Sequence, residues 1–304
     1  MGKWTTRDIP AQQGRVAVVT GTGGLGLETA LALTRAGAET IIAGRDPRKG
    51  AAAVARVSTS VPGGCVRYEQ LDLADLQSVA AFATRMRDQF ERLDLLINNA
   101  GVMVPPVRRE TADGFELQFG TNHLGHFALT GRLLSLLKGD HGARVVSLSS
   151  VAAREGRIDL DDLNSEAEYK PMPAYSQSKL ACLMFGLELQ RRSTAHDWGL
   201  TSVVAHPGVS RTDLLHNAPG RWSATGLART FLWFLFQPAA QGALPTLFAA
   251  TSPDARPGGY YGPDRLSETR GHPVAARIPP AALDDAVARR LWDLSDTTVG
   301  GFAA

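Results

Sequence analysis

The sequence is poor in cysteine and has no evident metal-binding cluster. Its 304 residues include only two cysteines, Cys65 and Cys182. Two thiols fit neither a disulfide framework nor a metal cluster, and both lie among apolar residues that suit buried thiols, so we expect a cytoplasmic protein. His123 and His126 lack carboxylate or cysteine neighbours, so we expect no metal and interpret both as packing or surface residues.

An excess of charge and long apolar runs are also missing. Lysine plus arginine (32) nearly balances aspartate plus glutamate (30), giving a formal net charge of +2. This balance offers no electrostatic reason to bind nucleic acid or an anionic membrane, so we expect a small-molecule partner. No run reaches the roughly 18 apolar residues of a membrane span, and the N-terminus lacks the apolar core of a secretory signal.

Short β-branched runs alternate with longer stretches of helical period. Strands are expected at 15–20, 39–43, 65–71, 93–97, 144–148, 201–205 and 258–262, and helices are expected to begin near Gly24, Pro47, Asp75, Thr111, Pro173 and Ala239. This order predicts one α/β domain of the doubly wound Rossmann type, with a seven-stranded, mostly parallel sheet between two helical layers. We expect residues 14–205 to form the cofactor-binding and catalytic core, and residues 206–304 the substrate lid and C-terminal part.

A glycine-rich turn follows the first expected strand. The stretch 18–26 reads VVTGTGGLG. From Gly21 it matches G-x-G-x-x-G through Gly23 and Gly26; from Thr20 it resembles a T-G-x-x-x-G-x-G turn that is one residue short. Both patterns place backbone N–H groups at the start of a helix against a pyrophosphate, where a side chain would collide. The turn therefore predicts a dinucleotide site.

The end of the second strand bears on the choice between NAD and NADP. An NAD site of this fold places an acidic residue there to bind the ribose 2′-hydroxyl. In this chain Gly44 stands near that position, Arg45 follows, and Arg48 lies a turn further on. Because arginine suits a 2′-phosphate, we expect NADP, while Asp46 keeps NAD open as an alternative.

Polar residues end the third and fourth strands. Asp72, in LDLAD, is positioned either to meet the adenine amino group or to cap the next helix. The fourth strand ends in LINNAG, an unusual ending for a buried strand unless the backbone passes close to a ligand.

Residues suited to proton transfer occur later in the chain. In AYSQSKLA, Tyr175 and Lys179 are four residues apart and share a helical face. An ammonium favours the phenolate form of a nearby tyrosine, so Tyr175 is a candidate general acid/base. Ser150 follows the fifth strand, at the edge where such sheets bind ligands. Asn122 interrupts an apolar helix, where a buried amide needs hydrogen-bond partners.

Together these features resemble the short-chain dehydrogenase/reductase family over nearly the whole chain. The matching elements are the glycine turn, Asp72, NNAG, Asn122, Ser150, YSQSK, and HPG at 206–208 with Thr212 after it. Within the family, TNHLGHF, DLDDLNSE, AYSQSKLA and RRLWDLS are similar to the retinol dehydrogenase and WW-domain-containing oxidoreductase group and its bacterial relatives.

The resemblance implies a role for each catalytic residue. Tyr175 would protonate a carbonyl oxygen or deprotonate an alcohol, and Lys179 would bind the nicotinamide ribose and favour the phenolate. Ser150 would orient the substrate oxygen, and Asn122 would hold a water in the proton relay. Hydride would pass between the nicotinamide and the substrate carbon. The cofactor residues implied by the motifs and the resemblance are Gly21, Gly23, Gly24, Leu25, Gly26, Arg45, Asp72, Leu73, Asn99, Ala100, Gly101, Tyr175, Lys179, Pro207, Gly208, Val209 and Thr212.

One departure from the family pattern concerns the glycine turn. The family's T-G-x-x-x-G-x-G turn is one residue longer than TGTGGLG. In that register Gly21, Gly24 and Gly26 are the family equivalents, and Gly23 permits a tighter turn. We expect the cofactor to bind with altered contacts near the adenosine phosphate.

The segment 210–237 is expected to form the substrate lid. Its aromatic and aliphatic content favours an apolar carbonyl or alcohol, although FLWFLF at 231–236 also fits a packed helix or a dimer face. The leading hypothesis is an NADP(H)-dependent oxidoreductase. The alternatives are a cofactor-binding regulatory or scaffold protein with little turnover and, more weakly, an extended-type sugar epimerase. The oligomeric state is left open, and a homo-oligomer is compatible with the resemblance, because the helices around Asn122 and Tyr175 commonly make dimer contacts in the family.

Overall fold

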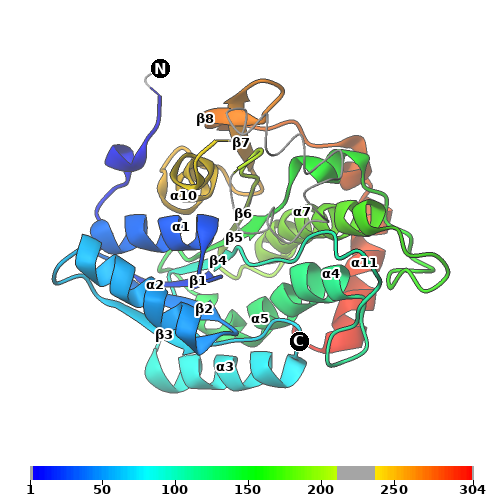
Figure 1. The fold of residues 1–304 in the computed structure, drawn as a ribbon, viewed down its shortest axis with the longest axis horizontal. Helices are drawn as coiled ribbons and strands as arrows, with labels where there is room; N and C mark the ends of the chain where they lie inside the picture. Colours follow the sequence, from blue (N-terminus) through cyan, green and yellow to red (C-terminus); the bar gives the residue numbers. More distant parts are fainter. Residues whose placement is uncertain (1–2, 211–236, 303–304) are drawn as a thin grey trace.

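The described part of the chain forms one mixed sheet between two helical layers (Figure 1). The structure is a computed structural model that describes residues 3–210 and 237–302. The strands are β1 (Val16–Thr20), β2 (Glu39–Gly44), β3 (Val66–Gln70), β4 (Leu95–Asn98), β5 (Arg144–Leu148), β6 (Thr201–Ala205), β7 (Tyr260–Arg265) and β8 (Arg270–Ala275). Their order is β3-β2-β1-β4-β5-β6-β7-β8, the doubly wound pattern extended by two strands.

The helical segments alternate with these strands. The α-helices are α1 (Gly24–Arg35), α2 (Pro47–Ser60), α3 (Leu76–Gln89), α4 (Leu117–Phe119), α5 (Gly125–Arg132), α6 (Leu134–Leu137), α7 (Pro171–Ala195), α9 (Ala239–Gly242), α10 (Leu244–Thr251) and α11 (Asp285–Val299). A π-helical turn, η2 (Gly120–Leu124), joins α4 to α5, and the 3-10 turns within the described residues are η1 (Thr6–Asp8), η3 (Val151–Glu155) and η6 (Pro280–Leu283).

Alternate residues of each central strand enter different cores. In β1, Ala17 and Val19 pack with α1, α2 and α10, whereas Val18 packs with α3, α5, α7 and α11. All four residues of β4 are buried, as expected for a parallel sheet covered on both faces. The covered sheet leaves its carboxyl-terminal edge as the place where loops gather.

Local capping sets where several helices begin. The carboxylate of Asp46 accepts hydrogen bonds from the N–H groups of Arg48 and Lys49 at the start of α2. Asp75 caps α3 in the same way through Gln77 and Ser78. These caps satisfy backbone donors that the helix itself leaves free.

Four expectations need correction. The sheet has eight strands, because β8 pairs antiparallel with β7. The helix expected near Thr111 begins at Leu117, after a short bridge between Glu110 and Glu116. Cys65 is exposed, and only Cys182 is a buried thiol.

The fourth correction concerns Asp72, which does not cap α3. Its Oδ1 accepts from the N–H of Ala74, and Asp75 provides the cap.

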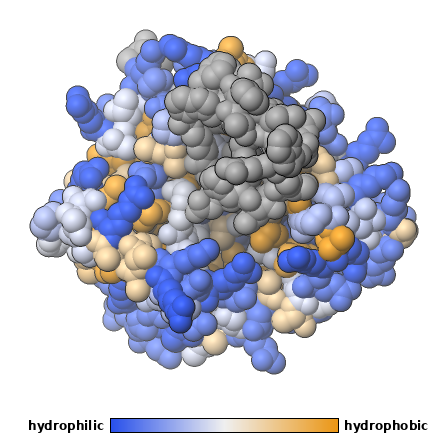
Figure 2. Space-filling model, in the orientation of Figure 1, coloured by the Kyte–Doolittle hydropathy of each residue, from blue (hydrophilic) through white to orange (hydrophobic). Residues whose placement is uncertain are grey.

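Polar residues cover most of the described surface in view in Figure 2. The large apolar residues that are exposed in the described part are Val107, Met172, Leu266, Val274 and Leu283. No helix of residues 3–210 and 237–302 has both the length and the apolar character needed to cross a membrane.

Candidate active site

The parallel strands bring most of the predicted site residues to one edge of the sheet. Gly21 follows β1, Asn99 follows β4, and Ser150 and Pro207 follow β5 and β6. Arg45 and Asp72 follow β2 and β3 at the same edge. This is the edge at which doubly wound sheets bind nucleotides, with the crossover point between β1 and β4.

The glycine turn has left-handed backbone at Gly21 (φ 102°) and Gly24 (φ 51°). A Cβ on Gly26 would stand 2.6 Å from both Asn99 Nδ2 and Gly21 O. Gly23 is extended at φ −140° and forms no side-chain cap on α1. Conformation or packing therefore requires glycine at 21, 24 and 26, the register of the shortened T-G-x-x-x-G-x-G turn.

Thr20, which sequence reasoning did not single out, organises the NNAG segment. Its Oγ1 accepts from the N–H groups of Asn99 and Ala100, both at 2.9 Å. Asn99 Nδ2 in turn donates to Thr20 O at 2.6 Å. The segment after β4 is thus fixed to the end of β1, which explains the amide-rich ending that the sequence displays.

The loop after β2 and the start of α2 carry basic side chains. Arg45 and Arg48 are exposed, and neither forms an ion pair with a residue in the described ranges. The carboxylate of Asp46 is occupied as the cap of α2. Leu73, by contrast, is buried in the core.

Lys179 is buried at the end of β5. The Nζ of Lys179 donates to Leu148 O at 3.1 Å, and Lys179 O accepts from Ser149 Oγ at 2.8 Å. Tyr175, one turn earlier on α7, is 8 % exposed. Two contacts between α7 and β5 therefore fix the lysine beside the strand end that carries Ser150.

Ser150 begins the turn η3, whose first N–H groups need an acceptor. Its Oγ accepts from Ala152 N at 3.2 Å. The turn η3 packs on α7, and a Cβ on Gly156 would stand 2.6 Å from Ser176 O. Close packing therefore holds the serine turn against the helix that carries Tyr175.

Asn122 lies in the π-helical turn and is almost fully buried. Its amide exchanges two hydrogen bonds with the backbone of Val102 and donates to Ser178 Oγ at 2.9 Å. A Cβ on Gly101 would lie 2.9 Å from Asn122 Oδ1 and 3.5 Å from Lys179 Nζ. The structure therefore brings Gly101, Asn122 and Lys179 together.

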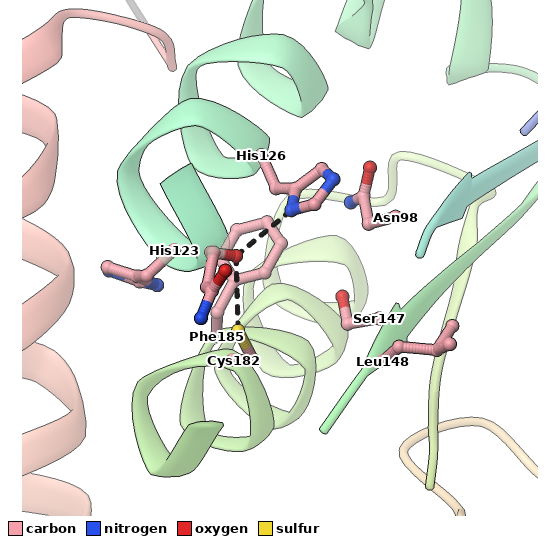
Figure 3. Close-up of a pocket in the computed structure, with 8 residues that line it drawn as sticks. Asn98, His123, His126, Ser147, Leu148, Cys182 and Phe185 are labelled. Atoms are coloured by element: carbon pink, nitrogen blue, oxygen red, sulfur yellow. Dashed lines mark hydrogen bonds between the residues drawn. The ribbon is translucent and has the colours of Figure 1, made fainter. Parts of the chain in front are cut away.

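A small cavity is lined by His126 and Cys182 (Figure 3), and Asn122 also lines it. His126 Nδ1 and Cys182 Sγ both donate to the main-chain oxygen of Asn122, at 2.9 and 3.1 Å. Burial lowers the pKa of His126 to about 4 and that of His123 to about 3, and it raises the pKa of the Cys182 thiol. Both histidines are therefore buried packing residues, as one of the two interpretations of the sequence predicts.

The turn after β6 contains Pro207, Gly208 and Val209. Gly208 is left-handed at φ 63°, and Val209 N donates to Thr269 O at 2.8 Å. Thr212 and most of the expected substrate lid, including FLWFLF, lie outside the described residues.

This fold, with a glycine turn after β1, Ser150 after β5, and Tyr175 and Lys179 on the helix that packs against β5, defines a class of nucleotide-dependent oxidoreductases. The family model described as short chain dehydrogenase matches residues 15–221, and the chain belongs to that family. It is an oxidoreductase that acts on a CH–OH/C=O pair with NAD(P), and it falls in the retinol dehydrogenase group.

Similar proteins cover almost the whole chain. Retinol dehydrogenase 13 of Homo sapiens is 41 % identical, over 94 % of this chain and 85 % of its own length. Polyprenol dehydrogenase of Homo sapiens is 40 % identical, over 83 % of this chain and 78 % of its own length. A solved structure from Mycobacterium paratuberculosis is 41 % identical, with a TM-score of 0.82 and full coverage of both chains.

Proposed function

We propose that this chain interconverts an apolar aldehyde or ketone with its alcohol, using NADP(H), with Tyr175 as the general acid/base. The observation that carries the proposal is the packing of α7 against the end of β5. Lys179 Nζ donates to Leu148 O, and Lys179 O accepts from Ser149 Oγ. These contacts hold Lys179 near Ser150, and Tyr175 lies one helical turn earlier on α7. In this reading residues 14–205 hold the cofactor and catalytic groups, and residues 206–304 complete the substrate side.

The residues present fit a dinucleotide. The N-terminus of α1 has no side-chain cap, so its free N–H groups suit a pyrophosphate between Gly21 and Gly26. Asp72 would meet the adenine, Asn99, Ala100 and Gly101 would line the centre, and Pro207 to Val209 would contact the carboxamide. A nicotinamide held there would supply or accept the hydride.

The chain's own residues would then handle the proton. In the reductive direction, Ser150 would orient the carbonyl oxygen by donating a hydrogen bond, and Tyr175 would transfer its hydroxyl proton to that oxygen. The nearby ammonium of Lys179 would stabilise the resulting phenolate until it regains a proton. Asn122 would hold the water through which that proton arrives.

Two kinds of support favour an apolar substrate. Two similar proteins are named after retinol and polyprenol, which are long apolar alcohols. The segment 211–236 is also rich in aromatic and aliphatic residues.

The test of catalysis is NADPH oxidation with a panel of medium- and long-chain aldehydes. We expect Tyr175→Phe to lower kcat by about 10²-fold or more, because it removes the transferable proton and little volume. Tyr261→Phe is the matched control, since its one hydrogen-bond partner among the described residues is Arg256 N, in the loop before β7. Full turnover by folded Tyr175→Phe would refute the assignment.

The test of cofactor choice is a tryptophan-fluorescence titration with NADPH and with NADH. Arg45→Ala should weaken NADPH binding by about tenfold and leave NADH binding unchanged, because only NADPH carries the 2′-phosphate. Arg56→Ala, which breaks a surface ion pair between α2 and Glu28 of α1, should change neither affinity. Equal weakening of both nucleotides by Arg45→Ala would contradict the preference for NADP.

A further inference from the structure

The hairpin between β7 and β8 has an unusual tip. Leu266, Ser267 and Glu268 are consecutive non-glycine residues in left-handed backbone, with φ of 49°, 54° and 64°. Such backbone persists where surrounding contacts impose it. Leu266 is exposed, whereas the carboxylate of Glu268 is largely buried and pairs with Arg154.

The carboxylate of Glu268 has partners from three segments. Oε2 accepts from His206 Nε2 at 2.9 Å and pairs with Arg154 Nη2 at 2.6 Å. Oε1 accepts from Arg277 N at 3.1 Å, and Arg154 Nη1 donates to Ser267 O. Burial raises the pKa of Glu268, but these partners outweigh burial and bring the pKa to about 2. The carboxylate therefore stays charged throughout the neutral range.

His206 connects this carboxylate to the turn after β6. Its ring is fully buried, and burial lowers its pKa. Because Gly208 N donates to Nδ1 at 3.3 Å, the ring proton is assigned to Nε2, which donates to Glu268. The adjacent Thr269 O accepts from Val209 N, so the hairpin holds this turn at two points.

Arg154 connects the same carboxylate to the turn after β5. It lies on η3, the 3-10 turn that Ser150 begins and that packs on α7. One carboxylate thus bridges the turn that carries Ser150 and the turn that carries Val209.

We propose that Glu268 is a positioning residue that holds these two turns at the spacing that hydride transfer needs. The proposal rests on the proposed function for its catalytic consequence, because Ser150 orients the substrate oxygen there and Val209 lies beside the nicotinamide. A displacement of about 1 Å between two such groups is enough to slow a reaction by about 10²-fold.

The experiment compares Glu268→Ala, Glu268→Gln and the wild type by kinetics and by amide hydrogen exchange. Glu268→Ala should lower kcat by at least about tenfold while KM for NADPH changes less than about threefold. Glu268→Gln keeps an acceptor for His206 but loses the charge that Arg154 needs, so it should restore part of the lost rate. Exchange should accelerate at 151–155 and at 206–209 in Glu268→Ala.

Arg265→Ala is the matched control, since this exposed residue lies on the same hairpin and only approaches Asp264, at 4.0 Å. It should keep wild-type kinetics and exchange. Acceleration confined to the hairpin, or wild-type kcat in folded Glu268→Ala, would overturn the proposal. Exchange is measured without substrate, so a wild type that reduces no carbonyl would refute the proposed function while leaving this test intact.

Discussion

The hydrogen bonds of Thr20 and His126 show how single buried groups fix the cofactor edge. His126 Nδ1 faces the main-chain oxygen of Asn122, which only accepts, so Nδ1 carries the proton. The Nε2 atom, 2.9 Å from Thr20 Oγ1, then accepts the hydroxyl proton of Thr20. That leaves the Thr20 oxygen free to accept from Asn99 and Ala100.

This arrangement predicts acid sensitivity. Burial lowers the pKa of His126 to about 4, so between about pH 6.5 and 4 the unfolded chain binds a proton that the folded chain does not. The free energy of unfolding should therefore fall as pH falls through this window, by up to about 1.4 kcal/mol per pH unit for this group. Urea unfolding at a series of pH values measures the slope.

The variant His126→Gln should reduce that slope by up to about 1.4 kcal/mol per pH unit, because it removes one titrating ring and leaves the contribution of buried His123. His196→Gln, at an exposed position, should leave the slope as in the wild type. If His126→Gln keeps the wild-type slope, the ring is not the source of acid sensitivity.

For single residues, the sequence predicts which side chains react better than it predicts which side chains hold them in place. Asn122, Ser150, Tyr175 and Lys179 stand out because their types suit proton transfer. Thr20, Arg154 and Glu268 do not, because a threonine ending a strand and charged loop residues are ordinary in sequence. Their roles depend on contacts between segments far apart in the chain.

Among the elements, the glycine turn yields the sharpest prediction. Gly26→Ala should destabilise the protein by about 1–3 kcal/mol and weaken NADPH binding, because its Cβ would collide with Asn99 Nδ2 and Gly21 O. Gly23→Ala should preserve both, since φ of −140° is accessible to alanine. Thermal unfolding and NADPH titration of the two variants measure the difference.

The two registers of the turn predict opposite rankings. The G-x-G-x-x-G register makes Gly23 essential. In the shortened turn Gly23 is expected to permit a tighter turn, but its backbone is extended at φ −140°, so that role does not require glycine at this position. Greater damage from Gly23→Ala than from Gly26→Ala would restore the first register.

The order of elements along the chain could be predicted because apolar strands and helix caps are local signals. The eighth strand could not, since RGHPVA contains glycine and proline and lies at the sheet edge, where ladder pairing is one-sided. The start of the helical segment at Leu117 was also missed, because the preceding turn depends on a bridge between Glu110 and Glu116.

At the scale of the whole molecule, α11 covers the outer side of α5 and α7 (Figure 1). Trp292 is buried, with ring centroids 4.8 Å from Phe127 and 5.7 Å from Phe185. Arg192 extends from α7 to Asp293 at 3.2 Å. The family resemblance implies dimer contacts on these helices, and in this chain α11 packs against both of them.

We therefore expect a monomer of about 32 kDa in light scattering coupled to gel filtration, because the apolar area that would drive pairing through α5 and α7 is already buried.

Trp292→Ala should lower the free energy of unfolding by about 3–5 kcal/mol, since it leaves a cavity among Phe127, Phe185 and Phe302. It should also produce concentration-dependent association, as the loosened helix uncovers the face. Leu283→Ala, an exposed residue in η6 just before α11, should alter neither property. A wild-type dimer that dissociates on substitution of exposed residues of α5 or α7 would show that α11 leaves this face free to pair.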